Sequence, residues 1–295
     1  MIRTEPLART LPRGVTGSSD GTCTVSGAAL RWLDCLDRAI VGVAEACGAE
    51  QHAFPPVIPA RDLERIDYFR SFPHLVTMPV TFPADEAAQQ RVAADCALDA
   101  TGSVPLREHA PVRHALIPAA CYPVYPMLGR SPLDRRVLVT TRGTCFRREV
   151  EFIPLRRQWT FSMREIVCVG TASEVREFLD RGRRLVEVLT GRLGLDPEWQ
   201  VASDPFFQPH RNPRALMQLL APVKHEAVVD ELAISSVNLH HDHFGRAFEI
   251  GRDGRAAHSG CVAFGLERWL GVMAGRWGPD PARWPGPGGS GGLDV

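Results

Sequence analysis

The segment from Thr144 to Gly170 constrains the fold more than any other part of this chain. Its sequence, TCFRREVEFIPLRRQWTFSMREIVCVG, predicts two strands on either side of a charged turn that contains proline. The outgoing strand runs from Cys145 to Glu149, and the returning strand from Trp159 to Val169 alternates apolar and polar residues. We therefore expect a β-hairpin here, with the remaining elements arranged around it.

The predicted hairpin carries side chains that suit a nucleotide. Arg147 and Glu149 share one face of the outgoing strand, because side chains at positions i and i+2 point the same way. An arginine suits a phosphate, a glutamate suits a base amino group, and Phe161 on the returning strand suits stacking on a ring. An isolated Phe-Arg-x-Glu motif is more often a surface hairpin with an ion pair, so these residues alone leave both interpretations open.

A second motif, Gly265-Leu266-Glu267-Arg268, follows an apolar run near the C-terminus and predicts the start of a helix. The pair of FRRE and GLER resembles motifs 2 and 3 of the class II aminoacyl-tRNA synthetase catalytic domain. Further segments are FPPVIP (54–59), SFP (71–73), AACYPVYP (119–126), REI (164–166), ASDPFF (202–207) and SGCVAFGLER (259–268). Together, over roughly residues 28–278, they resemble the amino acid:[carrier protein] ligases, which are truncated homologues of the zinc-dependent seryl-tRNA synthetases of methanogens.

The resemblance implies an α+β fold, with a mostly antiparallel sheet flanked by helices, and an ATP-dependent ligase. Such an enzyme activates a small amino acid such as glycine or alanine as an aminoacyl adenylate. It then transfers the aminoacyl group to the phosphopantetheine thiol of a carrier protein, with Mg²⁺ and Zn²⁺ as metals. The expected partners are therefore ATP, a small amino acid and a phosphopantetheinylated carrier protein, without tRNA and without a membrane.

The resemblance also implies roles for single residues. Arg147 would hold the α-phosphate and the substrate carboxylate, and Arg268 would hold the γ-phosphate; these two are the expected catalytic residues. Glu149 would accept from the adenine amino group, Phe161 would stack on the ring, and Arg157 would help with the distal phosphates. Asn238, His240 and His243 match an Asn-x-His-x-x-His-Phe-Gly run that borders the active site, and we expect Asn238 and His240 to contact the substrate.

Spacing alone picks out no metal site, since Cys121, Glu165 and Cys261 lie far apart in the sequence and buried thiols are more often core residues. The resemblance assigns these three residues as zinc ligands. Two thiolates and a carboxylate leave one coordination position open, as in a zinc site that handles substrate. In the family the α-amino group takes that position. The histidines within 240–243 have no carboxylate or thiol at a characteristic ligand spacing and do not favour a second metal site.

Two positions depart from the seryl-tRNA synthetases. Gln218 and Ala233 stand where acidic residues near the phosphates and magnesium are expected, although the carrier-protein ligases also lack the second acid. Gln218 leaves open how magnesium is held. It also leaves open a catalytically inactive, zinc-binding paralogue that acts by binding. A third alternative keeps adenylation and transfers the aminoacyl group to a small-molecule amine or a tRNA.

The sequence of 295 residues has a formal net charge of zero, which argues mildly against a large tRNA footprint. Its eight cysteines contain no CxxC pair and fit reduced thiols in a cytoplasm, and no uncharged apolar run approaches the length of a membrane span. We expect a flexible lead-in at 1–25, a catalytic domain at 26–278 with a small helical insertion at about 83–108, and a disordered tail at 279–295.

Apolar periodicity predicts the remaining elements. A helix at 28–47 followed by an extended segment to residue 59 has the shape of class II motif 1, which forms a homodimer interface in that family; an ordinary helix-to-strand crossover is the alternative. Further helices are expected within 85–100 and, with a serine cap, at 173–193. Short strands are expected at 216–223 and 232–239, separated by a polar turn at 225–231, and a strand-to-helix passage at 259–277.

Overall fold

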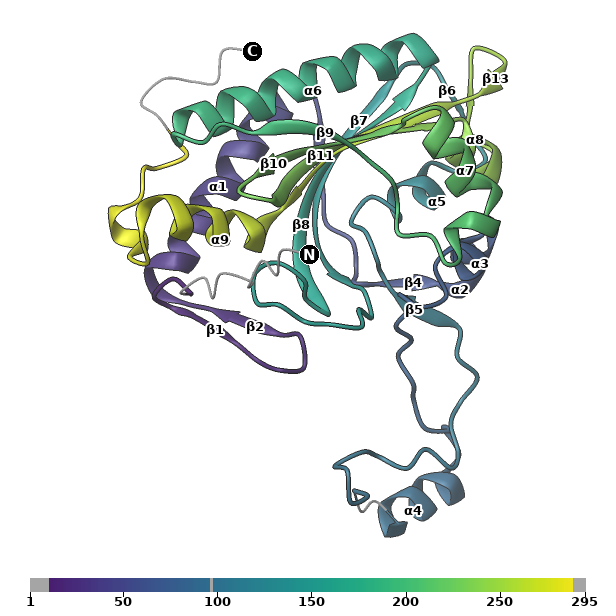
Figure 1. The fold of residues 1–295 in the computed structure, drawn as a ribbon. Coiled ribbons are helices and arrows are strands. Elements are labelled where there is room, and N and C mark those ends of the chain that lie inside the picture. Colours follow the sequence, from purple (N-terminus) through teal and green to yellow (C-terminus); the bar gives the residue numbers. More distant parts are fainter. Residues whose placement is uncertain (1–10, 96–97, 289–295) are drawn as a thin grey trace.

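A seven-stranded sheet forms the centre of the computed structural model, which describes residues 11–95 and 98–288 (Figure 1). Its strands, in spatial order, are β3 (Glu50–His52), β7 (Val137–Phe146), β8 (Thr160–Gly170), β14 (His258–Gly265), β11 (Leu232–His241), β10 (Lys224–Val229) and β9 (Glu198–Ala202). Only the β3 and β7 pair is parallel, and the other neighbours are antiparallel. The predicted hairpin is present as β7 and β8, and β7 begins earlier and ends sooner than expected.

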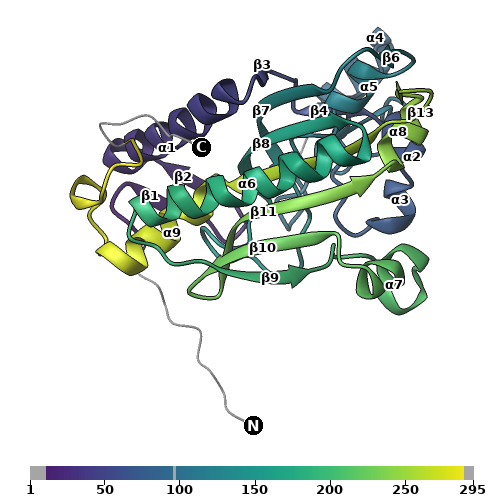
Figure 2. The same cartoon turned by 90° about the horizontal axis from the view of Figure 1, so that it is seen from above.

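Three long helices cover one face of the sheet: α1 (Gly27–Ala46), α6 (Ala172–Arg192) and α9 (Leu266–Trp277). Figure 2 shows α6 lying over the middle of the sheet. The helix approaches closely because Gly182 has no side chain; a Cβ there would lie 2.3 Å from Cγ2 of Val262. The predicted serine cap is wrong, because Thr171 caps α6 and forms a capping box with Glu174.

Short elements cover the other face: β4 (Val57–Pro59), α2 (Ala60–Arg65), α3 (Tyr68–Ser71), β5 (His114–Leu116), α5 (Val124–Leu128) and α8 (His243–Phe248). A small sheet of β6 (Pro132–Leu133), β12 (Gly251–Arg252) and β13 (Arg255–Ala256) adjoins them. Alternate residues of β8 enter the two cores, with Ile166 and Cys168 on the side of the long helices and Val167 and Val169 on the other. The sheet is therefore buried on both faces.

Both predicted flexible ends are partly wrong. Residues 11–25 include a hairpin of β1 (Val15–Gly17) and β2 (Cys23–Val25) rather than a lead-in without structure. At the other end, η2 (Pro281–Arg283) leads to Trp284, which is only 7% exposed and meets Trp32 edge to face at 5.4 Å. Burial of these two indoles outweighs the Pro/Gly-rich composition. Residues 1–10 and 289–295 lie outside the described residues.

The strand expected at 216–223 is also wrong, because α7 (Pro213–Leu220) occupies most of it. Asn212 caps this helix by accepting hydrogen bonds from the N–H groups of Arg214 and Ala215. The polar turn expected at 225–231 is also wrong, because most of this segment belongs to strand β10. The turn consists of Asp230 and Glu231 alone, whose φ angles are 48° and 63°. A two-residue hairpin turn of type I′ needs positive φ at both positions, and this tight connection lets β10 extend.

The insertion stands away from the body of the molecule (Figure 1). Its helix α4 (Glu86–Asp95) starts where Oδ1 of Asp85 accepts from the N–H of Ala88, and residues 98–100 are not helical. The boundaries of 83–108 stay a prediction. None of the helices in the described residues combines the length and apolar character that a membrane span requires.

A buried ion pair joins α1 to the central hairpin. Arg164 on β8 is 3% exposed, and its Nε and Nη2 donate to the two carboxylate oxygens of Asp37 at 2.8 and 2.9 Å.

We predict that Asp37→Ala lowers the free energy of unfolding by about 3–5 kcal/mol, because it leaves a buried guanidinium without its partner. Urea unfolding measures this. Glu108→Ala, which breaks the exposed pair with Arg91, is the control and should leave the curve nearly unchanged. Equal effects of both variants would contradict the prediction.

Candidate functional site

A cleft of about 590 Å³ opens between the sheet and the short elements, within the range of small-molecule sites. Strands β8, β10, β11 and β14 and the segment that follows β7 supply its wall, and α7, α8 and the loop at 118–122 close it. The sequence-predicted site residues all line it: Cys121, Arg147, Glu149, Arg157, Phe161, Glu165, Asn238, His240, Cys261 and Arg268. Residues from distant stretches of the chain thus meet in one cavity, while their individual roles stay predictions.

Two thiols and a carboxylate lie together at the inner end of the cleft. One ligand atom each of Cys121, Glu165 and Cys261 lies within 4.8 Å of the other two, and all three residues are buried. Oε1 of Glu165 accepts hydrogen bonds from the N–H groups of Ala120 and Cys121 at 2.9 and 3.3 Å, which fixes the carboxylate. Thiolates and a carboxylate at this separation fit a tetrahedral zinc site with one open position.

Both thiols have a pKa above its ordinary value and are therefore protonated when no metal is bound. A hydrogen bond to Cys261 raises the pKa of Cys121 well above its ordinary value, and burial raises it further. The same hydrogen bond lowers the pKa of Cys261, but burial and the nearby Glu165 raise it more. A cation that enters must therefore displace the thiol protons.

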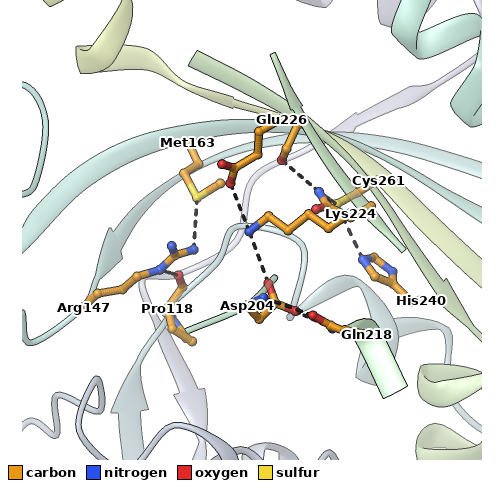
Figure 3. A network of polar contacts seen from close by, with 11 residues as sticks. Pro118, Arg147, Met163, Asp204, Gln218, Lys224, Glu226, His240 and Cys261 are labelled. Carbon is orange, nitrogen blue, oxygen red and sulfur yellow. Dashed lines mark hydrogen bonds and ion pairs between the residues drawn. The ribbon is translucent and has the colours of Figure 1, made fainter. Parts of the chain in front are cut away.

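Asn238 and His240 lie on β11 beside this cluster. Nδ2 of Asn238 is 3.3 Å from Sγ of Cys261. Nε2 of His240 is 3.7 Å from the same sulfur (Figure 3). Burial lowers the pKa of His240 to about 3 and that of His243, which begins α8, to about 4. Both imidazoles are therefore neutral at physiological pH.

Arg147 is half-buried in the wall of the cleft, just beyond the end of β7. Its Nε donates to the carbonyl of Pro118 at 2.9 Å, and Nη2 lies 3.8 Å from Sδ of Met163 (Figure 3). Its guanidinium carbon lies 5.2 Å from the ring centroid of Phe161, a cation–π contact. These contacts fix the side chain and leave a positive charge facing the cavity.

Glu149 does not lie on a strand as expected, because β7 ends at Phe146. It still lines the cleft, with Nε of Arg157 3.8 Å from its Oε2. Arg268 lies in the first turn of α9, where Nη1 donates to the carbonyl of Ala233 at 2.9 Å. The neighbouring Glu267 accepts from the N–H of Ser162 at 2.9 Å and so holds the start of α9 against β8.

Sequence reasoning missed a charged network on the floor of the cleft. Nζ of Lys224 lies 3.2 Å from Asp204 and 3.3 Å from Glu226, and Nε2 of Gln218 donates to Asp204 at 3.0 Å (Figure 3). Burial raises the pKa of Asp204, but Lys224 and Gln218 lower it more, so the carboxylate is ionised. The sequence feature that could have revealed this network is the alternation in KHEAVV at 224–229, which puts Lys224 and Glu226 on one face of a strand.

This network corrects the prediction about Gln218. Gln218 lies on α7 rather than on a strand before motif 3, and it serves as a partner of Asp204. Glu226 on β10 presents a carboxylate to the cleft, as does Glu165 on β8. Ala233 contributes its carbonyl to Arg268 instead of a side chain. Glu226 therefore supplies a carboxylate on a strand that precedes the GLER segment, while how magnesium is held stays an open question.

Comparisons with solved structures show the fold. A crystal structure of M. kandleri SerRS in complex with A. aeolicus tRNASec superimposes with a TM-score of 0.79 at 20% identity, over 92% of this chain and 57% of that chain. Cytoplasmic serine–tRNA ligase from Naegleria fowleri, solved with AMP, gives a TM-score of 0.63 at 14% identity, over 88% of this chain and 59% of that chain. The fold is that of the class II aminoacyl-tRNA synthetases, as predicted.

Comparisons of sequence narrow the family. The type-2 serine–tRNA ligase of Methanopyrus kandleri is 25% identical over 282 residues, and the match covers 83% of this chain but only 51% of that protein. No protein-family model matches the chain. Amino acid–[acyl-carrier-protein] ligase 2 of Bradyrhizobium diazoefficiens is 33% identical over 276 residues, or 90% of this chain and 81% of that protein.

Ligase 1 of the same bacterium is 36% identical over 251 residues, and the match covers 81% of this chain and 74% of the relative. Identity of this level over most of both chains agrees with the cleft, which brings together the residues of the FRRE, REI and GLER segments. The chain therefore belongs to the amino acid–[acyl-carrier-protein] ligase family.

Proposed function

We propose that this chain activates a small amino acid with ATP and transfers it to the phosphopantetheine thiol of a carrier protein. The observation that carries this proposal is the joint placement, in one cleft, of two arginines that face the cavity and of a buried thiol, carboxylate and thiol cluster. The names of the Bradyrhizobium relatives support a carrier protein as the acceptor.

The arginines bind the anionic groups of the substrates. Arg268, in the first turn of α9, adds its charge to the partial positive charge of the helix N-terminus and holds the γ-phosphate. Arg147 holds the substrate carboxylate beside the α-phosphate. Phe161 stacks on the adenine, Glu149 accepts from its amino group, and Arg157 stays near the distal phosphates. Lys224 adds a further cation at the floor of the cleft, and Glu226 is an oxygen donor for magnesium.

The cluster of Cys121, Glu165 and Cys261 holds the zinc ion. When bound, zinc supplies a Lewis-acidic position for the α-amino group of the amino acid. Arg147 then holds the carboxylate at the other end of the same backbone. Because both ends are held, discrimination falls to the space around the side chain, where Met163 and Phe161 line the cleft.

The chemistry has two steps. A carboxylate oxygen of the amino acid attacks the α-phosphorus of ATP, the bond from that phosphorus to the bridging oxygen breaks, and pyrophosphate leaves. In the second step the carrier thiol gives its proton to water, its sulfur attacks the activated carbonyl, the bond from the carbonyl carbon to the phosphate oxygen breaks, and AMP leaves. Arg147 stabilises the negative charge that develops on the phosphoryl oxygens, and positioning in the cleft contributes the rest.

We propose that the carrier protein binds to the outer face of α7. Met217 lines the cleft and is 62% exposed, and Leu219 and Leu220 beside it are 69% and 82% exposed. Exposed apolar side chains that adjoin a cleft mark an interaction surface. A carrier bound here would place its phosphopantetheine arm next to the opening, in line with the acceptor that the relatives' names give.

We also propose a homodimer. Helix α1 and β3, the edge strand of the sheet, are the segment whose shape resembles motif 1, and the edge offers unpaired backbone groups to a second copy. A cytoplasmic location stays a prediction.

The zinc site yields the first functional prediction. Purified protein should contain about one zinc ion per chain, and Cys121→Ser or Cys261→Ser should lose the zinc together with amino acid activation, because a ligand thiolate is removed. Elemental analysis and pyrophosphate exchange measure the two effects. Cys168→Ser, a buried thiol in the other core, is the matched control and should keep zinc. Zinc-free wild-type protein would contradict the prediction.

Because zinc and Arg147 hold the two ends of the amino acid backbone, the proposed site predicts which amino acids are activated. Pyrophosphate exchange should be fastest with glycine, alanine or serine, and their N-acetyl forms should be inactive because zinc needs a free amino group. Arg147→Ala should lower the exchange rate by about 10²–10³-fold, as for loss of a preorganised charge donor. Arg148→Ala, the adjacent exposed arginine that does not line the cleft, is the control. Equal use of N-acetylated substrates would overturn the assignment, and zinc binding without exchange would indicate an inactive paralogue.

The carrier protein, as the acceptor of the aminoacyl group, is tested separately from amino acid activation. Leu219→Glu combined with Leu220→Glu should raise the KM for carrier protein at least tenfold and leave pyrophosphate exchange unchanged, since an apolar contact becomes charged outside the cleft. Mass spectrometry of phosphopantetheinylated carrier protein measures the thioester. Arg192→Glu, on α6, is a control for the added negative charge. Efficient charging of tRNA by the wild-type protein would contradict the proposed acceptor.

A further inference from the structure

The sulfur of Cys261 has two nitrogen neighbours that the proposed reaction does not use. Nδ2 of Asn238 donates to Sγ at 3.3 Å, and Nε2 of His240 lies 3.7 Å from it. Asn238 and Cys261 are directly opposite each other in the antiparallel pair of β11 and β14. A thiolate accepts such bonds more strongly than a neutral thiol does, because its charge assists them. Both nitrogens are thus placed to act on the sulfur when it is deprotonated.

A β-bulge puts His240 in this position. Leu239 pairs with Gly260 and His241 pairs with Ser259, so His240 is the additional residue of β11 without a cross-strand partner. His241 takes a φ of 50°, which is uncommon for a residue other than glycine. Bulges redirect a side chain and occur often beside active sites. Here the bulge directs the imidazole towards Cys261.

The other ring nitrogen determines which tautomer faces the sulfur. Nδ1 of His240 lies 3.1 Å from the hydroxyl of Tyr125 and 3.2 Å from that of Ser259. Tyr125 is held rigidly, because its ring stacks on Phe244 with centroids 3.8 Å apart and planes 4° apart. Either hydroxyl can donate to Nδ1. A neutral imidazole then carries its one proton on Nε2, which points at Sγ.

We propose that Asn238 and His240 are positioning residues whose N–H groups hydrogen-bond to the Cys261 thiolate when zinc is bound. These bonds orient the sulfur and reduce the electron density that it donates, which leaves more positive charge on the ion for the amino group of the substrate. The inference rests on the zinc site of the proposed function. We therefore assign this positioning role to His240 in place of the direct contact with the amino acid that the sequence predicted.

The test uses protein reconstituted with Co²⁺, whose sulfur-to-cobalt charge-transfer absorption reports the state of the thiolate. His240→Asn removes the donor, because the shorter amide cannot reach Sγ. It should shift this absorption to longer wavelength and weaken zinc binding, measured by competition with a chelator, by about 10–100-fold. His240→Gln places an amide N–H near the position of Nε2 and should restore most of both properties. His258→Gln, on β14 and outside the cleft, is the matched control.

Asn238→Leu has a similar shape without the donor and should change both readouts in the same direction, which keeps the test decisive if His240→Asn fails to fold. Unchanged absorption and unchanged zinc affinity in a folded variant of either residue would overturn the inference. A wild-type protein that binds neither Zn²⁺ nor Co²⁺ would overturn the zinc site itself. If the wild-type protein shows the thiolate absorption and the variants show the same spectrum, only the role of Asn238 and His240 would be overturned.

Discussion

Two oppositely charged neighbours on β8 determine the register of the central sheet. Arg164 and Glu165 are 3% and 1% exposed, and alternation along the strand sends them to opposite faces. Arg164 meets Asp37 of α1, and Glu165 meets the backbone N–H groups of Ala120 and Cys121. A slip of one residue would exchange the two faces and leave both buried charges without partners, at a cost of several kcal/mol each.

The same register assembles the metal cluster. Glu165 pairs with Ala263 on β14, two residues from Cys261, so the carboxylate and the thiol point into the same side of the sheet. The loop that donates to Glu165 also carries Cys121. One set of backbone hydrogen bonds therefore both stabilises the buried carboxylate and brings the second thiol to it. Cleft and core share this face, so the three side chains of the cluster are buried.

Local sequence predicted the elements whose periodicity is long and regular, such as α1, α6 and the β7–β8 hairpin. It failed where burial or a turn competed with local composition. Trp284 packs on Trp32 although prolines and glycines surround it, and residues 216–220 form a helix because Asn212 caps it. Glu226 was overlooked because it lay in a segment expected to be a turn, and only the two-residue turn at 230–231 makes that segment a strand.

By itself the sequence determined the chemical identities of the site, since FRRE, REI and GLER supply the arginines and the acid, and two cysteines lie in segments that resemble known ligases. Tertiary structure alone decided how they act together. Cys121 and Cys261 are 140 positions apart and meet only because β8 and β14 pair in register. The bond from His240 to Cys261 depends on a bulge, which is a property of the pairing of two strands and leaves no periodic signal in either one.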